Sequence, residues 1–181
     1  MLRKGAGLFL GLTLAAVTGG CGLGAASGAP AGNAIAVSKV TGYWMNSLNS
    51  RYKTYQISPQ QLYNALQKNP HKYFLLDVRE ATTQGGVPGY DAFHIPGAVN
   101  IPFPQVGQEL SKLPKHQPIV VMCYTGQWSN QTMALLRILG YQAYSMHLGM
   151  ADWNHHTDVL PSRSSIPNFP VVSGSQPGTW H

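Results

Sequence analysis

Cys123 is the residue of this 181-residue chain whose type and position best suit covalent chemistry. It directly follows the apolar run Pro118-Ile119-Val120-Val121-Met122 and opens the stretch Cys123-Tyr124-Thr125-Gly126-Gln127-Trp128. A cysteine thiolate is a strong nucleophile. Backbone N–H groups of a tight loop that enters a helix converge on an anion, and the helix dipole adds to their effect. We therefore predict that Cys123 is a reactive centre that holds a thiolate or a persulfide anion.

The residues after Cys123 are expected to form an anion-binding loop. Its members are Tyr124, Thr125, Gly126, Gln127, Trp128 and Ser129. Gly126 allows a turn in which a side chain would clash, and Thr125 and Ser129 supply hydroxyl donors. The alternative is an inert, buried cysteine, which is common for this residue type.

Four expected strands and four expected helices position this loop. The segments 73–78 and 118–122 are apolar and have the length of buried strands, and 97–101 and 141–146 are expected to be two further strands. Between and beside them, helices are expected over 59–67, 104–113 and 130–139 and from Met150 onward. This alternation predicts an α/β fold, a central, mostly parallel sheet with helices on both faces. In such sheets ligands bind beyond the carboxyl ends of the strands, where Cys123 stands.

The N-terminus has the features of an export signal. Arg3 and Lys4 precede an apolar stretch over 5–20, too short for a spanning helix, which ends at Gly19-Gly20-Cys21. Cys21 after small residues resembles the lipobox of bacterial lipoproteins, although Thr18 stands where that motif usually has Leu. The resemblance implies lipidation of Cys21 and anchoring on the extracytoplasmic side of the bacterial cell membrane. A retained N-terminal anchor or an ordinary cleaved signal are the alternatives.

The remaining chain divides into one domain and its flanks. We expect a signal peptide over 1–20, a flexible tether over 21–38, an N-terminal extension with a short amphipathic helix over 39–56, a single domain over 57–160 and a mobile C-terminal tail over 161–181. Without residues 1–20 the chain has ten basic and six acidic residues, a formal charge of +4. No Lys/Arg run occurs, so nucleic acid is not an expected partner.

Four ordered motifs between about residues 57 and 153 resemble those of rhodanese-like domains. They are Leu75-Leu76-Asp77-Val78-Arg79-Glu80, His94-Ile95-Pro96-Gly97-Ala98-Val99-Asn100-Ile101-Pro102, the strand and loop over 118–126, and Leu148-Gly149-Met150-Ala151-Asp152-Trp153. Phe93 and Leu148 replace glycines that are common in the family. The resemblance implies a parallel sheet between two sets of helices.

The resemblance also implies a sulfurtransferase. Cys123 would accept sulfane sulfur from a donor such as thiosulfate or a persulfide and pass it to a thiophilic acceptor such as a thiol-bearing protein, with no metal or organic cofactor. The six-residue loop is similar to that of the sulfurtransferases, whereas the phosphatases of this fold have seven residues that end in Arg. The adjacent His155 and His156 are not joined by a cluster of metal-ligating residues. A non-enzymatic sulfur-carrier, redox-sensing or protein-binding module is the alternative function.

The loop departs from the pattern of many thiosulfate-using members, which carry Arg or Lys inside it. Tyr124, Gln127 and Trp128 stand there instead. An aromatic rim would suit a less charged or peptide-borne sulfur donor, or the rings would only cover the pocket wall.

Three further residues are expected to support the site. Asp77 and Arg79 would brace the loop and the sheet edge, and His94 would be a structural residue near the strand ends. We expect Glu80 to be a structural ion-pair partner.

Overall fold

The structure is a computed structural model that describes residues 38–39, 41–42, 55–155 and 166–180. The expected signal peptide over 1–20, Cys21, almost all of the tether over 21–38 and most of the extension over 39–56 lie outside these residues. No helix within the described ranges has the length and apolar character that a membrane crossing requires.

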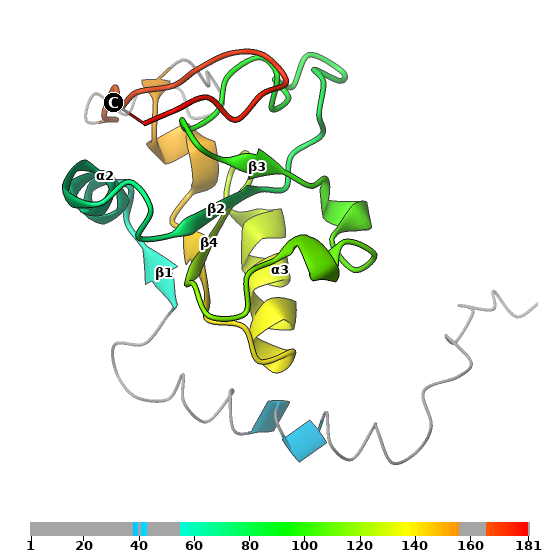
Figure 1. Ribbon diagram of the computed structural model, residues 1–181. Coiled ribbons are helices and arrows are strands. Elements are labelled where there is room, and N and C mark those ends of the chain that lie inside the picture. Colours follow the sequence, from blue (N-terminus) through cyan, green and yellow to red (C-terminus); the bar gives the residue numbers. More distant parts are fainter. Residues whose placement is uncertain (1–37, 40, 43–54, 156–165, 181) are drawn as a thin grey trace, which may run out of the picture.

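The core of the fold is a five-stranded, fully parallel sheet in the order β1-β5-β4-β2-β3 (Figure 1). The strands are β1 (Gln56–Ile57), β2 (Phe74–Asp77), β3 (Val99–Asn100), β4 (Ile119–Met122) and β5 (Ala143–Met146). The expected parallel α/β sheet is confirmed. The two-residue β1 was not predicted, because so short a strand has no apolar pattern of its own.

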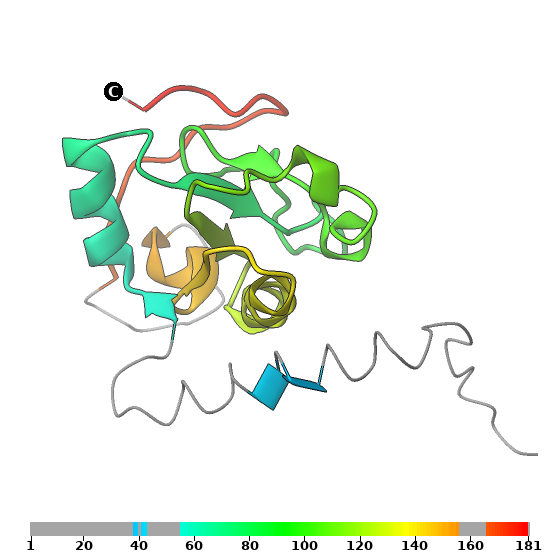
Figure 2. The same ribbon diagram turned by 60° about the horizontal axis from the view of Figure 1, so that its bottom comes forward.

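The two faces of the sheet carry separate apolar clusters, because successive strand residues point to opposite sides. Leu75, Val120 and Met122 pack on one face with Leu62 and Leu66 of α2 (Pro59–Lys68). On the other face, Leu76, Val121 and their neighbours pack against Met133 and Leu136 of α3 (Gln127–Ile138). Figure 2 shows α2 and α3 on either side of the sheet, so both faces are shielded from water.

Both long helices begin where local chemistry favours a helix start. Ser58 caps α2, since its hydroxyl accepts from the N–H of Gln61 while the Gln61 side chain accepts from the N–H of Ser58, and Pro59 follows at the first helical position. The prediction of a helix over 59–67 is confirmed. α3 begins at Gln127 instead of Asn130, so the second half of the expected loop is already helical.

The predicted helix over 104–113 is wrong. Two 3₁₀ turns occupy this stretch, η1 (Phe103–Gln105) and η2 (Leu110–Lys112). Pro104 lacks an N–H, and Gly107 disfavours a continuous helix between the two turns. The helix expected from Met150 is likewise a 3₁₀ turn, η3 (Gly149–Asp152).

The C-terminal segment 166–180 packs on the domain and is not the mobile tail that its Pro, Ser and Gly content predicted. His94 and Val172 exchange two backbone hydrogen bonds of 2.8 and 2.9 Å, and the indole N–H of Trp153 donates to the carbonyl of Pro170 at 3.0 Å. The Phe169 ring stacks on Tyr63 at 4.3 Å. This strap lies along the α2 side of the domain (Figure 1).

Truncation of the strap's aromatic anchor should destabilise the domain. Phe169→Ala is expected to lower the free energy of unfolding by about 2 kcal/mol, because it removes a half-buried ring that contacts Tyr63 and Trp153. Urea denaturation measures the change. Ser175→Ala, at an exposed position of the same strap, is the control and should stay within about 0.5 kcal/mol of wild type. Equal stabilities of the two variants would contradict the packing role.

Candidate active site

The sulfur of Cys123 lies in a cradle of hydrogen-bond donors. Its Sγ accepts the backbone N–H of Gly126 at 3.2 Å and that of Ser129 at 3.4 Å. The thiol faces the Ser129 hydroxyl at 3.7 Å, and that hydroxyl donates to the carbonyl of Gly126 at 3.0 Å. Two amides aimed at one sulfur stabilise a negative charge there.

The cradle follows from the junction of a strand and a helix. β4 ends at Met122, and α3 begins at Gln127 with Gly126 as its N-cap. Gly126 adopts a φ of 98°, a left-handed conformation that disfavours a side chain, and this turn directs the N–H groups toward Sγ. The positive end of the α3 dipole adds to the field at the sulfur.

The turn η3 clamps the loop from the other side. The N–H of Met150 donates to the carbonyl of Cys123 at 2.8 Å, and the N–H of Ala151 donates to that of Tyr124 at 2.9 Å. Gly149 lies so close that a Cβ there would come within 2.3 Å of the Cys123 carbonyl oxygen. Leu148, the residue before Gly149, adopts a left-handed φ of 52°.

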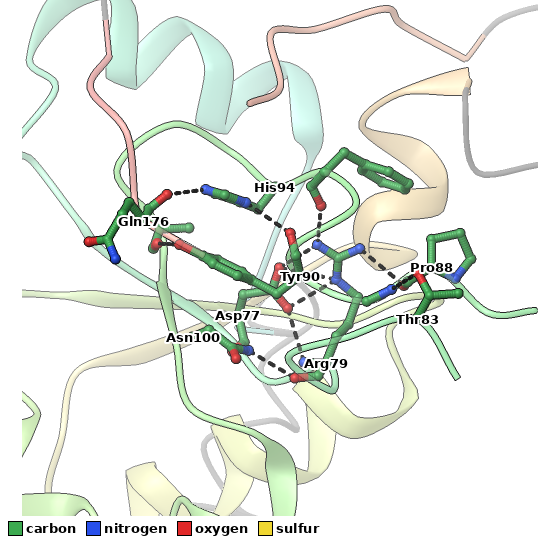
Figure 3. Close-up of polar contacts among 11 residues, drawn as sticks. Asp77, Arg79, Thr83, Pro88, Tyr90, His94, Asn100 and Gln176 are labelled. Carbon is green, nitrogen blue, oxygen red and sulfur yellow. Dashed lines mark hydrogen bonds and ion pairs between the residues drawn. The ribbon is translucent and has the colours of Figure 1, made fainter. Parts of the chain in front are cut away.

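Asp77 and Arg79 form a buried ion pair (Figure 3). Arg79 Nη2 donates to Asp77 Oδ2 at 2.7 Å and to the carbonyl of Phe93 at 2.6 Å, and Nε contacts both Asp77 oxygens at 3.1 Å. The side chain of Asn100 donates to the carbonyls of Asp77 and Arg79. The pair therefore fixes the segment between β2 and β3, which forms one wall of the pocket.

Tyr90 and His94 lie beside this network (Figure 3). Burial, with a further contribution from Asp77, raises the pKa of Tyr90 to about 12, so its hydroxyl stays protonated and donates to the carbonyl of Ala98 at 2.5 Å. The His94 ring stacks on Tyr90, and its nitrogens lie 2.9 Å from the Tyr90 carbonyl and 3.0 Å from that of Gln176. His94 thus connects the domain to the strap and does not line the pocket.

A pocket of about 410 Å³ opens above Cys123. Its lining includes four of the predicted loop residues, together with a wall that sequence reasoning missed. The loop residues are Tyr124, Thr125, Gln127 and Trp128. Arg79, a predicted supporting residue, and Glu80 also line the pocket, and the wall that was missed consists of Gln84, Val87, Pro88 and Gly89. Residues 84–89 have no periodic pattern, so only their position between two recognised motifs could have suggested them.

Trp128 forms part of the rim of this pocket. It is 39% exposed, and its ring stacks on Phe103 at 5.7 Å. Val87, 50% exposed, is the other large apolar side chain of the lining that faces water. Within the described part of the chain, no three metal-ligating side chains gather.

The close approach of Gly149 to the loop should make it intolerant of substitution. Gly149→Ala is expected to lower the free energy of unfolding by about 3 kcal/mol, since a left-handed conformation and a clash with the Cys123 carbonyl both oppose it. Gly140→Ala is the matched control: Gly140 is also left-handed, with φ of 87°, but a Cβ there meets only open space, so about 1 kcal/mol is expected. If denaturation experiments show equal losses of unfolding free energy in the two variants, the steric role of Gly149 against the loop is refuted.

Comparison with solved structures finds similar chains. A rhodanese-like domain protein of Staphylococcus aureus is 24% identical with a TM-score of 0.48, and the match covers 60% of this chain and 98% of that one. A rhodanese-related protein of Thermoplasma volcanium is 21% identical with a TM-score of 0.47, covering 65% and 96%.

Comparison of sequences identifies the family. The thiosulfate sulfurtransferase GlpE of Tolumonas auensis is 29% identical over 82 residues, which cover 45% of this chain and 72% of that protein. YrkF of Bacillus subtilis, named as a proposed sulfur carrier protein, is 29% identical over 85 residues, which cover 46% of this chain and 43% of YrkF, less than half its length. The family model of the rhodanese-like domain matches residues 58–156, and the chain therefore belongs to the rhodanese-like domain family.

Proposed function

We propose that the protein is a sulfurtransferase that carries sulfane sulfur as a persulfide on Cys123. The observation that carries this proposal is the pair of backbone N–H groups, from Gly126 and Ser129, that point at Sγ beneath an open pocket. Such donors stabilise an anionic sulfur without any titrating side chain. The similarity to a thiosulfate sulfurtransferase over 82 residues supports the same reaction class.

The proposed reaction has two displacement steps. The Cys123 thiolate attacks the outer sulfur of the donor, the bond between the two donor sulfurs breaks, and the donor leaves as sulfite or as a thiolate. The persulfide that forms, Cys–S–S⁻, is stabilised by the loop amides. A thiophilic acceptor then attacks the outer sulfur and regenerates the Cys123 thiolate. Sulfur changes carrier with no external oxidant or reductant.

A sulfur carrier without small-molecule turnover is the second candidate. Two observations favour it: YrkF is named for a carrier role, and the residues of the loop after Cys123 include no Lys or Arg to hold an anionic donor. In this case Cys123 would accept sulfur and deliver it only to a protein thiol.

Sulfur transfer should depend on Cys123. In a thiosulfate:cyanide assay, Cys123→Ser is expected to lower turnover by at least roughly a thousandfold, because a hydroxyl cannot form the persulfide. Intact mass spectrometry should detect one added sulfur atom on wild-type protein after incubation with donor, and none on the variant. Turnover retained in the variant would exclude the mechanism. An added sulfur atom without turnover would favour the carrier.

We also propose that the protein is exported and tethered to the membrane by lipid on Cys21. The supporting features are the basic start, the apolar stretch over 5–20 and the small residues before Cys21. The intact mass of protein extracted from membranes should correspond to a chain that starts at Cys21 and bears acyl groups. An intact mass that corresponds to an unmodified chain would refute the proposed lipid anchor.

A further inference from the structure

The charges that line the active-site pocket favour some sulfur donors over others. Among the described residues, the charged side chains of the lining are Arg79 and Glu80. Arg79 is 2% exposed, and the N–H groups of its guanidinium are directed at Asp77 and at the Phe93 carbonyl, with a longer contact of 3.5 Å to the Pro88 carbonyl. Its charge is therefore neutralised by Asp77, and it is not available to hold a donor.

Glu80 leaves the pocket with an uncompensated negative charge. The residue is half-buried, and we expected it to be a structural ion-pair partner. Its carboxylate instead makes neither an ion pair nor a hydrogen bond with any residue that the structure describes. A half-buried, unpaired carboxylate exerts a field in the pocket that solvent screens only in part.

The shape of the pocket favours an organic donor. A volume of about 410 Å³ is in the range that holds small organic ligands and far exceeds what one thiosulfate ion fills. Val87, Pro88 and Trp128 give its rim an apolar character, and such surfaces contact a carbon framework more favourably than a hydrated anion. The loop amides accommodate one negative charge on the reacting sulfur, but a dianion would bring a second charge near Glu80.

We propose that Glu80 selects sulfur donors by charge, and that the pocket takes persulfides borne on an organic or peptide framework with a cationic group, such as an ammonium, in preference to thiosulfate. This inference rests on the proposed function of Cys123. The apolar rim contacts the framework, Glu80 pairs with its cation, and the outer sulfur reaches Cys123. Glu80 is a specificity residue in this scheme and takes no part in bond making.

The transfer balances without another reactant. The Cys123 thiolate attacks the outer sulfur of R–S–SH and forms a new S–S bond as the old one breaks. The products are Cys123–S–S⁻ and R–SH, since the proton of the outer sulfur passes to the departing thiolate. The acceptor half-reaction is the reverse, with a second thiol in the place of R–SH.

Three small organic donors that carry different charged groups on a two-carbon framework test the proposal. They are the persulfides of cysteamine, N-acetylcysteamine and mercaptopropionate, whose frameworks carry an ammonium, a neutral amide and a carboxylate, and thiosulfate is included as the inorganic donor. The single-turnover rate of sulfur addition to Cys123 is measured by intact mass. For each variant, every rate is divided by the rate with the neutral persulfide, so that a change in the general reactivity of Cys123 cancels.

Wild-type protein should load sulfur about tenfold faster from the cationic than from the anionic persulfide, a factor that one charge interaction of this kind provides. The preference should decline as salt is raised. Glu80→Gln should bring the ratio of the cationic to the anionic loading rate close to one. Glu80→Lys should invert this ratio and accelerate loading from thiosulfate. Glu109→Gln, which removes a carboxylate outside the pocket, is the matched control and should keep the wild-type ratio.

Two results separate this inference from the proposed function. If the neutral persulfide loads Cys123 but wild type and Glu80→Gln have the same ratio, or thiosulfate is the fastest donor, the charge selection is refuted and the sulfur transfer stands. If no donor adds sulfur to Cys123, both are refuted. Thermal unfolding of each variant checks that the ratios come from folded protein.

Discussion

The site depends on two hydrogen bonds that join the loop after β4 to the turn after β5. Met150 and Ala151 donate to the carbonyls of Cys123 and Tyr124, so these carbonyls point away from the sulfur and the N–H groups of Gly126 and Ser129 point toward it. Without that clamp, the peptide planes of the loop could rotate and present carbonyl oxygens to an anion. Gly149 also packs closely against the Cys123 carbonyl, and this steric contact restricts the same peptide plane.

A second constraint sets the opposite wall of the pocket. Removing a charged pair from water is costly, and the Asp77–Arg79 pair offsets this cost by several hydrogen bonds to the backbone and to each other. Arg79 reaches the carbonyls of Phe93 and Pro88, and thereby shapes the irregular segment between β2 and β3. Its positive charge is neutralised by Asp77, so the part of the pocket lining that the structure describes includes an arginine but no free cation.

Most of the fold could be predicted from local patterns. β2 and β4 lie within apolar runs of strand length, and Ser58-Pro59 defines the start of α2. The stretch 104–113 was expected to be one helix, but Pro104 and Gly107 oppose continuous helical hydrogen bonding. The strap was mistaken for a free tail, since its composition is that of a linker and its contacts, such as Phe169 on Tyr63, join residues far apart in sequence.

The candidate site could also be predicted in part from local sequence patterns. Cys123 and its loop are contiguous, so spacing alone placed them at a strand end. His94 lies in a recognisable motif, yet its ring bonds to Tyr90 and Gln176, and no local pattern indicates the second partner. Glu80 adjoins Arg79 in the sequence and suggested an ion pair, but Arg79 is already satisfied by Asp77.

The central claim is that the backbone of the loop stabilises an anionic sulfur on Cys123. A crystal structure of the protein loaded with sulfur tests this most directly. The outer sulfur should lie within the pocket, within hydrogen-bonding distance of backbone nitrogens of the loop over 124–129. An outer sulfur that points into solvent away from these amides, or a cysteine that retains no sulfur, would contradict the account.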